Sequence, residues 1–103
     1  MGYKVVLTEA AQEDLDGILG YIAHSLANPM AALAFADAVE RCYSNLEQMP
    51  RMYETCQDSR LSSLGYRKAV IKNYFLVYKI QERTKTVYVL RFFYGRQDYA
   101  KRL

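Results

Sequence analysis

The chain contains few of the residues that carry metal and redox chemistry. Its 103 residues include two cysteines, one histidine and no tryptophan. Cys42 and Cys56 lack metal-ligand spacing and form no Cys-x-x-Cys motif, so we expect two reduced thiols. The single histidine, His24, argues against a histidine-based catalytic triad or metal site. We therefore expect no metal and no cofactor.

Several common motifs are also missing. No Gly-rich phosphate loop, Gly-x-Ser-x-Gly or His-Glu-x-x-His occurs, which argues against nucleotide hydrolysis and the common hydrolase mechanisms. No apolar run approaches the roughly 20 residues of a membrane span, and the first ten residues lack a signal-peptide core. We expect a cytoplasmic protein without a membrane partner. Its length and globular composition predict one domain, residues 1–103.

The last third of the chain contains three runs rich in Val, Ile, Tyr and Phe. Residues 66–71, 74–80 and 86–94 are separated by short polar breaks, a pattern typical of a three-stranded antiparallel meander. Strict alternation gives the last strand one face with Val87, Val89, Arg91 and Phe93, and another with Tyr88, Leu90, Phe92 and Tyr94. Because both faces are largely apolar, we expect helices on one face of the sheet and a tail or partner on the other.

The first half of the chain predicts one strand and two helices. Residues 3–7 are β-formers, Thr8 is a candidate N-cap, and Asn28-Pro29 can restart a helix that ends before Pro50. The first helix has an apolar stripe of Ala11, Leu15, Ile18, Ile22 and Leu26. The second has Phe35, Val39, Cys42, Leu46 and Met49. Such a short break between helices predicts an antiparallel hairpin.

The element order is therefore β-α-α-β-β-β. It predicts an α+β fold in which a helix hairpin packs on a mostly antiparallel, twisted sheet. Residues 51–65 read as a loop with at most one short helical turn, and residues 96–103 as a short C-terminal tail with one or two helical turns. We expect a core that includes Leu15, Ile22, Val39, Leu46, Leu76, Tyr78 and Leu90.

Charge is distributed unevenly along the chain. Residues 60–103 contain eleven Lys or Arg against two acidic residues, a balance of +9, whereas residues 1–59 contain three basic against nine acidic residues, a balance of −6. A basic sheet with interleaved tyrosines suits a polyanion or an acidic, amphipathic protein segment. Arg, Lys and Tyr can also cleave RNA without a metal, by moving the 2′-hydroxyl proton and stabilising the phosphorane-like charge. The residues alone leave binding and cleavage both open.

The element order and three short segments resemble the RelE/ParE superfamily of toxins from bacterial type II toxin–antitoxin modules. The segments are Asp14-Leu15, Phe75-Leu76-Val77-Tyr78, and residues 90–98, which read LRFFYGRQD. The resemblance covers essentially the whole chain. It implies a cognate antitoxin as partner, in a toxin–antitoxin hetero-oligomer.

Members of this superfamily differ in their action. RelE-like toxins cut mRNA on the ribosome, and ParE-like toxins block DNA gyrase. The long helices resemble ParE, as does the last segment, although Tyr94 replaces a histidine and Gln97 an arginine of the ParE pattern. RelE-type ribonucleases carry an arginine just before Leu-Val-Tyr, where this chain has Phe75. The resemblance therefore favours gyrase as target, with ribosome-dependent mRNA cleavage as the alternative and an inert toxin as a third possibility.

The resemblance also indicates candidate site residues. A ribonuclease would use Arg91, Tyr94 and Lys68 as catalytic residues. Target or antitoxin binding would involve Arg67, Lys72, Arg91, Arg96 and Tyr99. A plainer expectation for Arg91 is an ion pair with a nearby carboxylate such as Asp98.

Overall fold

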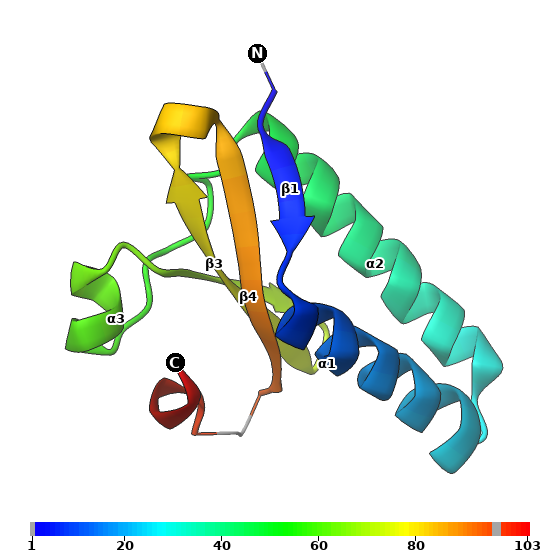
Figure 1. Ribbon diagram of the computed structural model, residues 1–103. Helices are drawn as coiled ribbons and strands as arrows, with labels where there is room; N and C mark the ends of the chain where they lie inside the picture. The colour runs from blue at the N-terminus through cyan, green and yellow to red at the C-terminus, as the bar shows by residue number, and fades with distance from the viewer. Residues whose placement is uncertain (1, 96–97) are drawn as a thin grey trace.

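The computed structural model describes residues 2–95 and 98–103, which contain a four-stranded sheet (Figure 1). Its strands are β1 (Lys4–Leu7), β2 (Arg67–Ile71), β3 (Tyr74–Gln81) and β4 (Thr86–Tyr94). The order across the sheet is β1-β4-β3-β2. Strand β1 runs parallel to β4, whereas the β2–β3 and β3–β4 pairs are antiparallel. The predicted meander and the mostly antiparallel sheet are confirmed.

Two long helices cover one face of this sheet. Helix α1 (Glu9–Gly20) continues into one π-helical turn, η1 (Tyr21–Ser25), and α2 (Pro29–Gln48) returns beside it (Figure 1). The Thr8 hydroxyl accepts a hydrogen bond from the Ala11 amide at 3.1 Å and caps α1. Asn28 caps α2 in the same way through the Ala31 amide, also at 3.1 Å. The predicted helix hairpin and both caps are confirmed.

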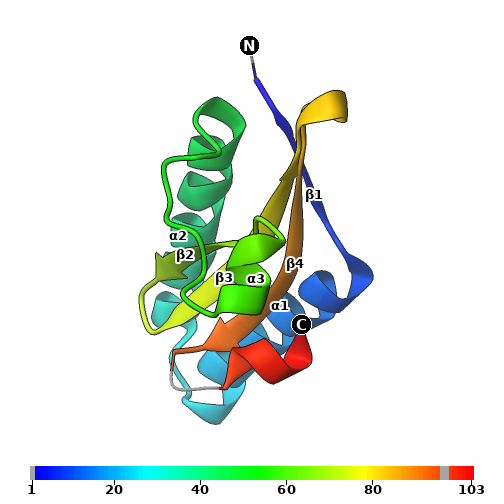
Figure 2. The ribbon, with the colours of Figure 1, turned by 90° about the vertical axis from the view of Figure 1, so that its left-hand side faces the viewer.

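Short helical turns cover the opposite face of the sheet. Figure 2 shows α3 (Ser59–Ser63) and the C-terminal 3-10 turn η3 (Tyr99–Arg102) in front of the strands. The Arg60 guanidinium joins them by donating to the carbonyl oxygens of Ala100 at 2.7 Å and Leu103 at 3.3 Å. The tail therefore lies on the second face, as the apolar pattern of the strands predicted. A further 3-10 turn, η2 (Glu82–Thr84), connects β3 to β4.

The sheet separates two apolar clusters. The larger one lies between the long helices and the sheet, and the smaller one lies under α3 and η3. Five of the seven predicted core residues are buried: Ile22, Val39, Leu46, Leu76 and Tyr78. Leu15 and Leu90 are half-buried, and Cys42 is buried as predicted. The Tyr78 hydroxyl is satisfied inside the core because it donates to the Pro50 carbonyl oxygen at 2.5 Å.

The predicted helix stripes are wrong at two ends. Leu26 is 54% exposed and Met49 is 63% exposed. The π-helical turn η1 places more residues in one turn than an α-helix does, which rotates Leu26 away from the stripe. Met49 is the C-cap of α2, with φ −140° and ψ 74°, so it no longer follows the helical period.

The predicted faces of the last strand are also wrong beyond its middle. Val89 pairs with Tyr78 and Arg91 with Val77, so Leu90 is an extra residue in a β-bulge. A bulge reverses the alternation for the residues that follow it. Phe92 therefore packs in the cluster under the long helices, whereas Phe93 packs in the smaller cluster on the second face.

Candidate functional site

The second half of β4 has α1 at its edge instead of a neighbouring strand. Strand β1 ends at Leu7, opposite Val89. Beyond that point the Thr8 hydroxyl donates to the Leu90 carbonyl oxygen at 2.8 Å, and the Asp14 carboxylate accepts from the Phe92 amide at 3.0 Å. Asp14 thus satisfies a backbone donor that a strand neighbour would otherwise take.

Arg91 forms a bidentate ion pair with the same carboxylate. Its Nε lies 2.6 Å from Asp14 Oδ2 and its second terminal nitrogen 3.0 Å from Oδ1, with the two side chains 30% and 18% exposed. The hydrogen bond to Asp14 raises the pKa of Arg91. The expected ion pair of Arg91 with a carboxylate is confirmed, but the partner is Asp14 and not Asp98, because Asp14 reaches β4 from the first helix and Asp98 pairs with Lys101 at 3.6 Å.

Three aromatic rings pack together on the second face. We call Phe75, Phe93 and Tyr99 the aromatic cluster; its ring centroids lie between 5.0 and 5.7 Å apart. Phe75 is only 2% exposed. The Lys68 ammonium lies 4.2 Å from the centroid of Phe75 and 5.3 Å from that of Tyr99, as in a cation–π contact. Lys68 and Tyr99 therefore meet at one site, held by aromatic packing.

Cys56 lies in the smaller apolar cluster, which Tyr99 also contacts. Burial raises the pKa of the Cys56 thiol, while a hydrogen bond to Tyr99 acts in the opposite direction. Burial raises the pKa of the Tyr99 hydroxyl too. The sequence did not indicate this neighbourhood, because Cys56 falls in a segment without periodicity.

The other predicted binding residues are dispersed. The Arg67 guanidinium donates to the carbonyl oxygens of Tyr53 at 2.6 Å and Arg51 at 3.4 Å, so it fastens the segment that follows α2. Lys72 is exposed in the turn between β2 and β3 and has a left-handed backbone, with φ 56°. Arg96 lies outside the described residues.

Three hollows of the surface are lined by five of the candidate residues. The first, of about 660 Å³, lies between the connecting end of the helix hairpin, where η1 leads into α2, and the β2–β3 turn, and both Lys72 and Tyr94 line it. The second, of about 350 Å³, is lined by Arg91, Tyr94 and Arg102 among others. The third, of about 490 Å³, includes Lys68 and Tyr99. Arg91 and Tyr94 therefore share a hollow, and Lys68 lies in a different one.

The first hollow has wall residues that the sequence did not indicate as candidates. Tyr21 and Leu26, at the end of the hairpin, form part of its wall. Both are about half exposed, and the exposure of Leu26 follows from the π-helical turn, which the apolar stripe of the sequence did not indicate.

Two further features are missing from the described residues. Within residues 2–95 and 98–103, no three His, Cys, Asp or Glu side chains come together as a metal site. Over the same part of the chain, no helix has the length and apolar character needed to cross a membrane.

The fold is similar to those of solved chains from toxin–antitoxin systems. A chain of the RelBE2 toxin–antitoxin complex from Mycobacterium tuberculosis is 24% identical, with 91% of this chain and 99% of that one covered and a TM-score of 0.65. A chain of the chromosomal ParDE system from P. aeruginosa is 19% identical, with 89% and 95% covered and a TM-score of 0.69. YafQ from E. coli is 17% identical, with 89% and 92% covered and a TM-score of 0.54. At these identities the similarities establish the fold alone.

Sequence comparison identifies the family. A search of curated protein sequences found no match. Residues 5–99 match the family model described as the ParE toxin of the type II toxin–antitoxin system parDE. This match extends from β1 to the start of η3, and it confirms the resemblance found in the sequence. The chain therefore belongs to the ParE toxin family of type II toxin–antitoxin systems.

Proposed function

We propose that this toxin inhibits growth by binding DNA gyrase and not by cleaving RNA. The observation that carries this proposal is the burial of Phe75, which occupies the place where RelE-type ribonucleases have an arginine. Its ring is 2% exposed and packs within the aromatic cluster, beneath the tail. An apolar ring in that place supplies no charge to a transition state.

The cations near this position already have partners. Metal-independent RNA cleavage needs groups that transfer a proton and cations that meet the developing phosphorane charge. The Lys68 ammonium lies over the rings of Phe75 and Tyr99. Two nitrogens of the Arg91 guanidinium donate to the two oxygens of Asp14. Neither is free to follow a reacting phosphate without giving up its present contacts. This supports a toxin that acts by binding.

Messenger RNA cleavage on the ribosome is the second candidate. Arg91 and Tyr94 line the same hollow, and Tyr94 is 49% exposed, so an acid–base residue and a cation lie together at one opening. If this pair were catalytic, Arg91→Ala would slow cleavage by about 10²- to 10³-fold, the usual effect of removing one transition-state donor. In a toxin that only binds, the same substitution would weaken association and change no chemical step.

Induction of the toxin in cells tests the two mechanisms together. DNA supercoiling, double-strand breaks and the integrity of translated mRNA are followed over the first minutes. Gyrase binding predicts DNA damage while mRNA remains whole. Codon-positioned cuts in mRNA with intact DNA would contradict the proposal, as would normal growth without either lesion. Arg91→Ala is induced in parallel to measure its effect on whichever lesion occurs.

We further propose that a cognate antitoxin neutralises the toxin. The polarised charge of the chain and its exposed apolar side chains suit an acidic, amphipathic partner. The most economical candidate is a small protein encoded next to the toxin gene. Co-expression of the two proteins with a tag on one of them should yield a stable complex. Repeated failure of every neighbouring product to co-purify would contradict this partner.

A further inference from the structure

The first hollow combines apolar walls with one cation at its rim. We propose that it is the docking site for an acidic, amphipathic segment of the antitoxin, which inserts a large apolar side chain and places a carboxylate on Lys72. This inference rests on the antitoxin partner proposed above and specifies where and how that partner binds. The hollow measures about 660 Å³, within the range of specific binding pockets.

The walls of the hollow are contributed by elements far apart in the sequence. Tyr21, Ile22 and Leu26 come from the end of the first helix and its π-helical turn, Phe35 from α2, and Tyr74 and Tyr94 from neighbouring strands. The rings of Tyr74 and Tyr94 lie 5.6 Å apart, and those of Phe35 and Tyr74 lie 5.2 Å apart. These edge-to-face contacts make one wall a packed aromatic surface.

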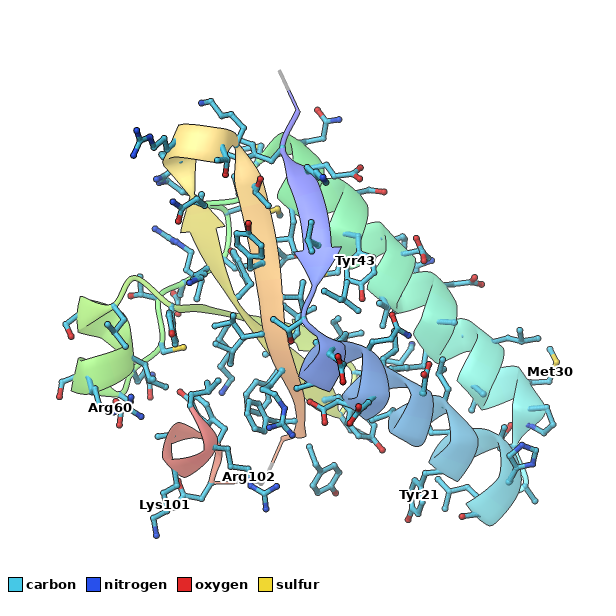
Figure 3. The ribbon with its side chains drawn as sticks, viewed as in Figure 1. Tyr21, Met30, Tyr43, Arg60, Lys101 and Arg102 are labelled. Atoms are coloured by element: carbon cyan, nitrogen blue, oxygen red, sulfur yellow. The ribbon has the colours of Figure 1, made fainter. Side chains whose placement is uncertain are left out.

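The rim of the hollow leaves large apolar side chains in water. Tyr21, Leu26 and Tyr94 are each about half exposed. Met30 is more exposed still, and Figure 3 places it with Tyr21 at the connecting end of the hairpin, where the first helix leads into α2. Several large apolar side chains exposed together at one end of a small protein are typical of an interaction surface. An apolar side chain from a partner would remove this surface from water.

The charge at the rim of the hollow favours a partner segment with a negative charge. Among the described residues that line it, Lys72 is the one with a charged side chain. Lys72 forms no ion pair with any described residue. A carboxylate beside the inserted apolar side chain would therefore gain a partner, whereas a basic segment would be repelled.

The turn that presents Lys72 is held in a sparsely populated conformation. A left-handed backbone is uncommon for a lysine, and such positions often mark functional sites. The turn is anchored because the Gly95 amide donates to the Asn73 carbonyl oxygen at 2.9 Å. A side chain at residue 95 would place its Cβ 3.0 Å from that oxygen, so any larger residue would push the turn by a few tenths of an ångström. The lysine is thus kept at the rim by the end of β4.

A single-stranded nucleic acid fits the same hollow poorly. Such ligands need a series of cations along the phosphate backbone together with ring faces on which successive bases stack. Here one cation borders walls that include Ile22, Leu26 and Ala31. Although another wall is aromatic, a single cation does not meet a series of phosphates, whereas it matches one carboxylate beside one inserted apolar side chain.

The test uses the full-length toxin and the purified antitoxin encoded beside its gene, with affinity measured by titration calorimetry. Leu26→Asp should weaken binding by about 30-fold or more, as expected for a charge placed in an apolar anchor site. Lys72→Glu should weaken it by about tenfold, with a smaller dependence on salt. Two matched controls lie outside the hollow and should change affinity less than threefold: Met49→Asp, at the other end of α2, and Lys4→Glu, on β1.

Hydrogen exchange of the unmodified complex gives a second measurement that requires no variant. Amides of residues 21–26 and 72–74 should exchange more slowly when the antitoxin is bound. Wild-type affinity of both hollow variants together with unchanged exchange there would overturn this docking site while leaving the antitoxin partner intact. No binding to the wild-type toxin would contradict both. A fluorescent RNA oligonucleotide gives the third outcome. If it binds the wild-type toxin, does not bind Leu26→Asp and is not displaced by the antitoxin, the hollow would be assigned to nucleic acid instead.

Discussion

Replacing Asp14 by Ala should destabilise the protein more than replacing its ion-pair partner Arg91. Asp14 accepts two hydrogen bonds from Arg91 and a third from the Phe92 amide. Loss of a partly exposed bidentate pair costs about 1–2 kcal/mol, and a backbone amide left without its acceptor costs about 1–2 kcal/mol more. We therefore expect Asp14→Ala to lower the free energy of unfolding by about 3 kcal/mol.

Arg91→Ala removes the ion pair but leaves the Phe92 amide bonded to Asp14, so its cost should be about 1–2 kcal/mol. Urea unfolding of the two variants and of the double variant measures both values and their coupling. Asp16→Ala is the matched control, because Asp16 is an exposed carboxylate on the same helix whose one donor among the described residues is Gln12. An Arg91→Ala variant that is as unstable as Asp14→Ala would refute the role of Asp14 at the strand edge, as would unchanged hydrogen exchange of the Phe92 amide in Asp14→Ala.

Three further substitutions test other parts of the structure. Tyr43→Phe should raise the unfolding free energy by about 1 kcal/mol in thermal or urea unfolding, because the buried Tyr43 hydroxyl has no hydrogen-bond partner among the described residues; a loss of stability would show that the hydroxyl is satisfied. Glu82 accepts from the Tyr3 hydroxyl and pairs with Arg51, contacts that lower its pKa from 4.5 to about 2. Its stabilising contribution is therefore present above pH 4.5 and lost as the pH falls through about 2, so Glu82→Gln should flatten the stability profile in that window, and an unchanged profile would contradict this. Lys72→Gly should stabilise the turn by about 1 kcal/mol by relieving the left-handed lysine, yet weaken antitoxin binding; a stability gain with full affinity would remove Lys72 from the binding site.

Local features of the fold could be predicted from the sequence, because neighbouring residues determine them. Thr8 and Asn28 cap the helices through amides three residues later, and the alternation of the three runs determines the strands. The predictions failed where one residue changes the period. The π-helical turn moved Leu26 out of the stripe, and the bulge at Leu90 turned Phe93 to the second face.

The site depends on contacts between distant segments, and the sequence indicated its components without their arrangement. Asp14 belongs to a segment that resembles the family, yet its contact with Arg91 crosses 77 positions of the chain. The hollow brings Leu26 beside Lys72 only after the hairpin packs on the sheet. The contacts of Lys68 with Phe75 and Tyr99 could not be predicted from the sequence either, because they form only after the tail folds over Phe75.

A supercoiling assay with purified DNA gyrase tests the proposed target most directly. The toxin is added at increasing concentration, with and without the antitoxin, and a parallel reaction follows mRNA on translating ribosomes. Binding to gyrase predicts a dose-dependent loss of supercoiling that the antitoxin reverses, while the mRNA stays intact. Full gyrase activity at saturating toxin, together with cleavage of ribosome-bound mRNA, would contradict it.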